Sequence, residues 1–216
     1  MKKFGFTIAE LTVSFAVIGI IAALTLPNLM QNTQNRQIAP KLTKAASMFQ
    51  QAAATMLSDL GIETISDKYG LNDAKDFMEK LSDYLKITES VEDPISGATG
   101  KCLEEEDLKF TTTYIAKDGV KYSLKFKDPT SPTEVPHKQM IGYIRIDING
   151  SNPPNLYASD AFVFALSGAG TLKPMGGEGN DTGCLWVANC AANETPEDPV
   201  ACAGHIFENN FKVLYK

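Results

Sequence analysis

Histidine is scarce in this sequence, and recognisable catalytic motifs are absent. There are only two histidines, His137 and His205, among 216 residues, and neither lies in a pattern typical of a Ser, Cys or metal-dependent hydrolase. The glycine-rich segment 176–179 lacks the lysine and the following helix of a phosphate-binding loop. These absences predict that the protein is not an enzyme.

Positive charge is also in short supply. The 20 Lys and Arg residues are outnumbered by 26 Asp and Glu, which gives a net charge of −6 at pH 7. A protein that coats nucleic acid gathers Lys and Arg on one face, whereas the only dense basic spot here is Lys2 and Lys3. The composition therefore disfavours a nucleic-acid partner.

The N-terminus is where the apolar residues concentrate. Leu11 to Leu26 carry no charge, and from Phe6 to Leu26 the only charged residue is Glu10. A helix of that length spans about 31 Å, close to the hydrocarbon thickness of a membrane. We expect a membrane-spanning helix with Lys2 and Lys3 on the cytoplasmic side.

Two simpler interpretations compete with this one. A secretory signal peptide would give a mature start near Pro27, but the apolar run ends without a small-x-small cleavage site and contains Glu10. A plain single-pass anchor would carry Glu10 for no reason. A carboxylate in such a segment costs about 2.5 to 3.5 kcal/mol on insertion scales, so we expect Glu10 to be functional and to have a partner.

The segment GFTIAELTVSFAVIGIIAALTLP, from Gly5 to Pro27, resembles the N-terminal signature of type IV pilins and type II secretion pseudopilins. The resemblance lies in the short basic leader ending at Gly5, in Phe6, in Glu10 four residues later, in the apolar helix and in Pro27 at the family's usual kink. It covers about the first fifty residues. Ala9 departs from the pattern, because the family generally has a larger aliphatic residue before the glutamate.

The resemblance implies a structural subunit of a filament. Prepilin peptidase would cleave between Gly5 and Phe6 and methylate the new N-terminus, and the chain would stay in the bacterial inner membrane with its C-terminal domain extracytoplasmic. In a bundle of apolar helices, the amine of Phe6 and the Glu10 carboxylate of a neighbouring subunit could neutralise each other and set one axial stagger.

The implied partners are other pilin or pseudopilin subunits, prepilin peptidase and the inner-membrane assembly platform. The filament could be a type IV pilus, a secretion pseudopilus or a DNA-uptake pilus, and only the last would bring nucleic acid. A membrane-anchored extracytoplasmic domain that binds a ligand or calcium and does not polymerise is the alternative function.

Four segments are expected along the chain: a leader at 1–5, a transmembrane and assembly helix at 6–27, its amphipathic continuation at 28–61 and a globular domain at 62–216. Pro40 should bend or interrupt the helix. Beyond it, apolar residues at helical spacing should pack on a sheet. They are Leu42, Ala45, Phe49, Ala52 or Ala53, Met56 and Leu60.

The globular part is predicted to be α+β, with the long helix packed on an antiparallel sheet of about four strands. We expect a short surface helix at 72–86 and a loop at 91–107. Alternating patterns predict strands at 110–116, 120–126, 139–147 and 161–167, the first two joined by an Asp-Gly turn. From Met175 onward the chain is rich in glycine and should be mostly loop.

The connection between the last two of these strands is the candidate metal site. Asp147, Asn149 and Asp160 could converge on calcium, a cation that prefers hard oxygen ligands. Related major pseudopilins hold calcium in a loop of this region, although the pattern here lacks the bidentate glutamate of an EF-hand. The simpler interpretation is that these residues only satisfy turns.

Four cysteines, Cys102, Cys184, Cys190 and Cys202, allow three complete pairings that the sequence does not rank. An extracytoplasmic location favours disulfides, and we expect at least one bridge among the last three. The alternative is zinc bound by the last three cysteines and His205, but its first cysteine pair is too widely spaced.

Overall fold

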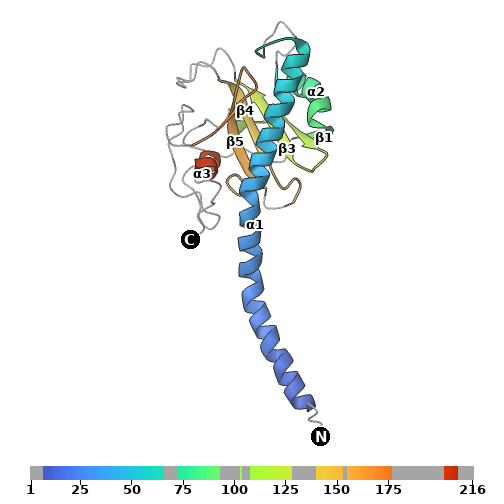
Figure 1. The fold of residues 1–216 in the computed structure, drawn as a ribbon, viewed down its shortest axis with the longest axis vertical. Coiled ribbons are helices and arrows are strands. Elements are labelled where there is room, and N and C mark those ends of the chain that lie inside the picture. Colours follow the sequence, from blue (N-terminus) through green and yellow to red (C-terminus); the bar gives the residue numbers. More distant parts are fainter. Residues whose placement is uncertain are drawn as a thin grey trace. The chain divides into compact units, whose positions relative to one another are not determined.

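The computed structural model describes residues 7–65, 73–92, 103, 108–127, 140–152, 155–176 and 202–208; for 25–36, 205, 207 and 208 it describes the backbone only. Within these ranges, three helices and six strands follow one another in sequence (Figure 1). They are α1 (Ile8–Leu60), α2 (Ala74–Leu85), β1 (Ile87–Glu92), β2 (Thr112–Ala116), β3 (Lys121–Phe126), β4 (Met140–Asp147), β5 (Ala161–Ser167), β6 (Leu172–Pro174) and α3 (Cys202–Glu208).

Contacts within the chain group it into two units, Met1–Gln37 and Ile38–Lys216, and helix α1 contributes to both. In the first unit the described side chains of α1 are mostly apolar and almost all exposed. Within the described ranges, no helix is long and apolar enough to cross a membrane.

Neither Pro27 nor Pro40 interrupts α1, which runs without a break from Ile8 to Leu60. Of the two effects expected at Pro40, a bend or an interruption, the interruption is therefore absent. Pro40 lies on the exposed side of the helix, where water can hydrogen-bond the carbonyl that the proline ring leaves without a donor.

In the second unit α1 buries one stripe of apolar residues, which confirms the predicted amphipathic helix. The buried members are Ala39, Leu42, Ala45, Ala46, Phe49, Ala52, Ala53, Met56 and Leu57. Leu60 is an exception, since 39% of its surface is exposed. The helix ends there in a Schellman motif: Gly61 has a φ of 67°, and the amide of Ile62 donates to the carbonyl of Leu57 at 3.0 Å.

The sheet is antiparallel and its strands follow chain order, β1-β2-β3-β4-β5-β6. The α+β class is confirmed, but the expected number of about four strands is wrong, because β1 and β6 add an edge strand on each side. The predicted hairpin joins β2 to β3, with Gly119 at a φ of 87° in its turn. A short helix, α3, also lies in the region expected to be mostly loop.

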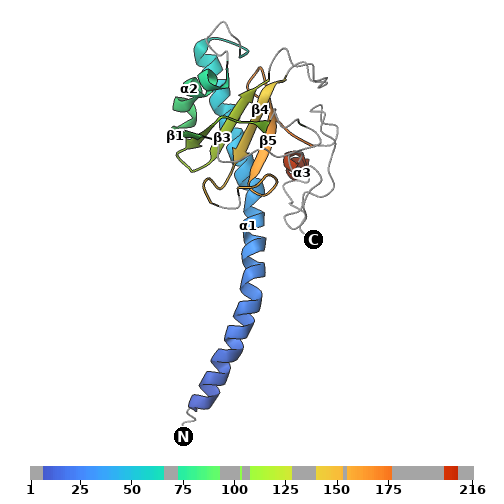
Figure 2. The same cartoon turned by 180° about the vertical axis from the view of Figure 1, so that it is seen from behind.

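Both faces of the sheet are covered, as β5 illustrates. Its residues Phe162, Phe164 and Leu166 belong to the core that contains the buried stripe of α1, and Val163 and Ala165 belong to a second core with Phe110 and Met175. Figures 1 and 2 show α1 and α2 on the same face of the sheet. A strand buried on both faces reads as a continuous apolar run, which is why the sequence predicted β5 correctly.

Helix α2 begins and ends at specific caps. The side chain of Asp73 accepts a hydrogen bond from the amide of Asp76 at 2.8 Å, and Lys86 adopts the left-handed conformation with a φ of 56° at the other end. The helix buries Phe77, Met78, Leu81 and Leu85. Its position confirms the helix predicted at 72–86.

Candidate functional site

The candidate cleavage site, Gly5 and Phe6, lies outside the described residues. The backbone of Pro27 is helical, and its side chain is among those that the structure does not describe. The N-terminal candidate that the structure does describe in full is Glu10.

Glu10 closes a capping box at the start of α1. Its Oε2 accepts hydrogen bonds from the amide and the hydroxyl of Thr7, both at 2.8 Å, and the Glu10 amide donates to Thr7 Oγ1 at 3.2 Å. The pattern Thr-x-x-Glu satisfies two otherwise unpaired groups at a helix N-terminus, and the negative charge also suits the helix dipole there. Glu10 therefore has a partner within its own chain, and its carboxylate is held at the end of the helix that follows Phe6.

The sequence analysis missed the role of Thr7. The signal was present, because Thr-x-x-Glu before an apolar run is a helix-start pattern in its own right.

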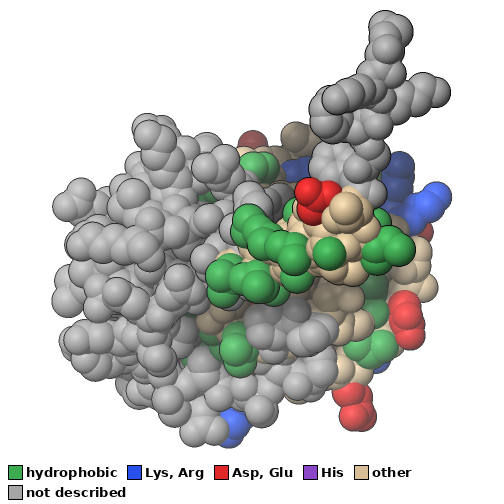
Figure 3. All heavy atoms as spheres, turned by 90° about the horizontal axis from the view of Figure 1, so that it is seen from below, with side chains coloured by type: hydrophobic (Ala, Val, Ile, Leu, Met, Phe, Trp, Pro, Cys, Tyr) green, Lys and Arg blue, Asp and Glu red, His purple; other side chains and the backbone are tan. Residues whose placement is uncertain are grey.

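Large apolar side chains are exposed around α1 after this cap. Seen from below in Figure 3, hydrophobic side chains gather on the near end of the helix. The exposed large apolar residues of this part of α1 are Ile8, Leu11, Val13, Phe15, Val17, Ile18, Ile20, Ile21 and Leu24. Contiguous apolar surface of this kind marks an interaction site with lipid or with protein.

The structure brings the three predicted calcium ligands together in the loop between β4 and β5. Asn149 Nδ2 donates to Asp160 Oδ2 at 2.8 Å. Asp160 also accepts from the amides of Asn155 and Leu156, at 2.8 and 2.7 Å. Asp147 Oδ1 accepts from the amide of Asn149 at 3.1 Å. These bonds support the simpler interpretation, in which the side chains satisfy the backbone of the loop.

Buried side-chain oxygens of this loop nevertheless have no hydrogen-bond partner among the described residues. Asp147 Oδ2 and Asn155 Oδ1 are both buried, and only 2% of Asp147 is exposed. Burial raises the pKa of Asp147 to about 6, and the negative charge of Asp160 acts in the same direction, while the amides of Asn149 and Gly150 and the charge of Lys121 lower it. These are the oxygens that a cation would use as ligands.

In the part of the chain that the structure describes, no group of three or more His, Cys, Asp or Glu could hold a metal ion. Calcium at the loop would thus need backbone carbonyls or water to complete six to eight oxygen ligands.

Cys202, at the start of α3, is disulfide-bonded. Cys102, Cys184 and Cys190 lie outside the described residues, so the pairing stays a prediction. A cysteine in a disulfide is not a thiolate ligand, so zinc bound by Cys202 is not compatible with this structure.

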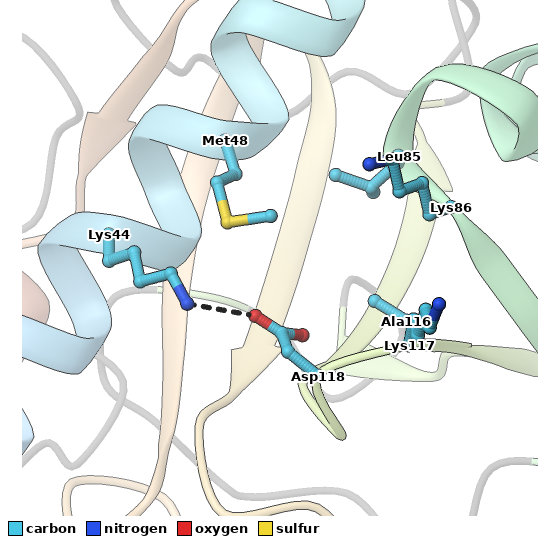
Figure 4. Close-up of a pocket in the computed structure, with 7 residues that line it drawn as sticks. All are labelled: Lys44, Met48, Leu85, Lys86, Ala116, Lys117 and Asp118. Carbon is cyan, nitrogen blue, oxygen red and sulfur yellow. Dashed lines mark hydrogen bonds and ion pairs between the residues drawn. The ribbon is translucent and has the colours of Figure 1, made fainter.

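A cavity of about 230 Å³ opens between α1, the C-terminal end of α2 and the turn from β2 to β3 (Figure 4). Its apolar lining residues are Met48, Leu85 and Ala116, and its charged ones are Lys44, Lys86, Lys117 and Asp118. No local sequence pattern predicts this cavity, because its residues come from three separate elements.

Comparison of the chain with protein-family models, with curated proteins and with solved structures finds no match.

Proposed function

We propose that this protein is a prepilin-like structural subunit of a type IV pilus or of a type II secretion pseudopilus. Prepilin peptidase cleaves it after Gly5, and it assembles with other subunits through the N-terminal part of α1. Before assembly the chain is held in the inner membrane by this helix, with the domain 38–216 outside the cytoplasm. The proposed role is structural, not catalytic.

The observation that carries the proposal is the exposed apolar surface of α1 between Ile8 and Leu24. Leaving nine large apolar side chains in water is unfavourable, by about 1.5 to 3 kcal/mol for each side chain that could be buried. Lipid would cover this surface before assembly and neighbouring helices would cover it in a filament. The same helix could thus serve as anchor and as filament core.

Glu10 gives this association a defined register. In the described chain its carboxylate is bound only to the first turn of its own helix, through Thr7, and stays exposed. Cleavage after Gly5 would place a charged amine on Phe6. In a bundle of apolar helices that amine and the Glu10 carboxylate of another subunit would neutralise each other, so subunits would prefer one stagger.

The processing step is tested by intact-mass and N-terminal peptide analysis of the protein purified from its native membrane. We expect a mature chain that starts at a methylated Phe6. A start near Pro27, or an uncut Met1, would overturn the proposal.

The assembly step is tested by Glu10→Ala. We expect the variant to be made and anchored normally and to form few or no filaments, as seen by shearing cells and counting fibres by electron microscopy. Glu92→Ala, which removes an exposed acid from β1, is the matched control and should assemble normally. Normal filaments from Glu10→Ala would exclude the stagger argument.

The alternative function is an anchored domain that binds calcium and does not polymerise. The buried, unpartnered oxygens of Asp147 and Asn155 favour it. If the loop binds calcium, adding the ion should raise the melting temperature of the wild type. The free energy of unfolding should rise by about 2.7 kcal/mol when the free calcium concentration is a hundred times the dissociation constant. Asp147→Asn should remove this gain and Asp118→Asn should retain it. No gain in the wild type would leave the loop as a set of turns.

A further inference from the structure

The cavity between α1, α2 and the β2–β3 turn combines an apolar floor with a positive rim. We call it the lysine pocket, lined by Lys44, Met48, Leu85, Lys86, Ala116, Lys117 and Asp118. Figure 4 shows the lysines at the margin, with Met48, Leu85 and Ala116 around the space between them. An occupant that fits this arrangement has an aliphatic side chain next to acidic groups.

Its charge differs in sign from that of the whole chain. Lys44 forms a salt bridge with Asp118 at 3.4 Å, which leaves Lys86 and Lys117 as excess positive charge in a protein of net charge −6. Among the described residues, neither of these two lysines forms a salt bridge. The amide of Lys117 donates to the carbonyl of Lys86 at 3.0 Å, so the backbone holds the two lysines close together.

A surface with the complementary chemistry lies at the C-terminal end of α1. Leu60 interrupts the buried stripe and is 39% exposed, with the exposed carboxylates of Asp59 and Glu63 beside it in sequence. We call these three residues the acidic knob. The hydroxyl of Tyr84 donates to Asp59 at 3.0 Å and fixes one of the carboxylates. Leu60 lies sixteen positions after Lys44 in α1, about 24 Å along the axis, so pocket and knob are distinct surfaces.

We propose that the lysine pocket of one copy of this chain receives the acidic knob of the next copy. Leu60 would enter the space between Met48, Leu85 and Ala116, while Asp59 and Glu63 face the lysines of the rim. Because the two surfaces differ, the contact is heterologous and repeats from copy to copy, which generates an open helical assembly unless the rotation closes a ring. The inference rests on the proposed filament and names the contact between its globular domains.

Zero-length cross-linking tests the contact in filaments of the full chain. Filaments are grown from equal amounts of ¹⁵N-labelled and unlabelled protein and treated with a carbodiimide, which joins a lysine amine to a carboxylate that touches it. We expect peptides of mixed isotope content that link Lys86 or Lys117 to Asp59 or Glu63. Mixed peptides that link other surfaces only would overturn the inference.

Charge reversal tests the same contact by function. Lys86→Glu with Lys117→Glu, and separately Asp59→Lys with Glu63→Lys, should each lower filament yield about tenfold, because like charges then meet across the contact. The four changes combined should restore most of the yield. Lys75→Glu with Lys80→Glu, the same charge change on exposed positions of α2, is the matched control and should have little effect.

Failure of this contact is distinguishable from failure of the proposed function. If wild-type filaments form and depend on Glu10, but neither reversal lowers the yield, the pocket–knob contact is wrong and the filament role stands. If the wild type forms no filaments under any condition, both are wrong. Restoration by the combined variant also excludes misfolding as the cause of either loss.

Discussion

Helix α1 has two stretches, residues 8–24 and 38–60, that contain similar apolar amino acids but differ in how far these are exposed. Phe15, in the first stretch, is 64% exposed, whereas Phe49, in the second, is fully buried and stacks on Tyr122 with ring centroids 5.9 Å apart. The first stretch is apolar over most of its surface, with Glu10, Thr12 and Ser14 as its polar residues, while the second combines one apolar stripe with polar positions. A helix that is apolar over most of its surface needs lipid or other helices to cover it, and a striped one needs only its own sheet.

The largest expected effect is the difference in stability between alanine substitutions at the two phenylalanines. Phe49→Ala should lower the free energy of unfolding of the domain by about 3 to 5 kcal/mol, because it leaves a cavity between α1 and the sheet. Phe15→Ala should change it by less than about 0.5 kcal/mol, since no packed core is lost. Chemical denaturation of both variants in detergent, followed by near-ultraviolet circular dichroism, measures the difference. Equal losses would contradict the division of the helix into two functions.

The next effect concerns charge. Ile18→Lys should disfavour membrane insertion by about 2.5 to 3.5 kcal/mol and release part of the protein from the membrane fraction. Gln51→Lys, at an exposed position of the second stretch, should leave fractionation unchanged. Membrane flotation and immunoblotting give the readout. Unchanged flotation of Ile18→Lys would argue against an anchor in this stretch.

A smaller difference in stability is expected between alanine substitutions at two glycines, one in each unit. Gly170 has a φ of 76°, and a Cβ there would lie 2.9 Å from the Cβ of Ala53 on α1, so Gly170→Ala should cost about 1 to 3 kcal/mol of unfolding free energy. Around Gly19 there is open space, so Gly19→Ala should be neutral or should favour the helix by up to about 1 kcal/mol. Thermal denaturation of the pair distinguishes them. A neutral Gly170→Ala would mean that this turn can move away from α1.

The smallest effect is at the capping box. Thr7→Val should weaken the first turn of α1 by about 0.5 to 2 kcal/mol, because Glu10 loses the hydroxyl that it accepts from, and Thr7→Ser should retain the cap. Amide hydrogen exchange of residues 8–11 in micelles reports the change. Equal exchange in the valine and serine variants would show that the hydroxyl contributes nothing.

The interior of the sheet could be predicted from the sequence, but its edges could not. Strands β3, β4 and β5 show alternating or continuously apolar patterns because the faces they lie between are buried. Strand β1 has three consecutive exposed residues, and β6 has three residues including Pro174, so neither carries a pattern of its own. Pairing with β2 and β5 stabilises them, and pairing is a tertiary interaction.

The candidate site residues show the same division between features that nearby residues determine and features that depend on tertiary packing. The sequence by itself determined the apolar N-terminal run, the position of Glu10 and the striped helix, because each depends on residues within one or two helical turns. Only the tertiary structure decided that Asp147 Oδ2 and Asn155 Oδ1 are buried without partners and that Lys44, Lys86 and Lys117 surround one cavity. Burial and convergence depend on which distant segments pack together, and no local pattern records that.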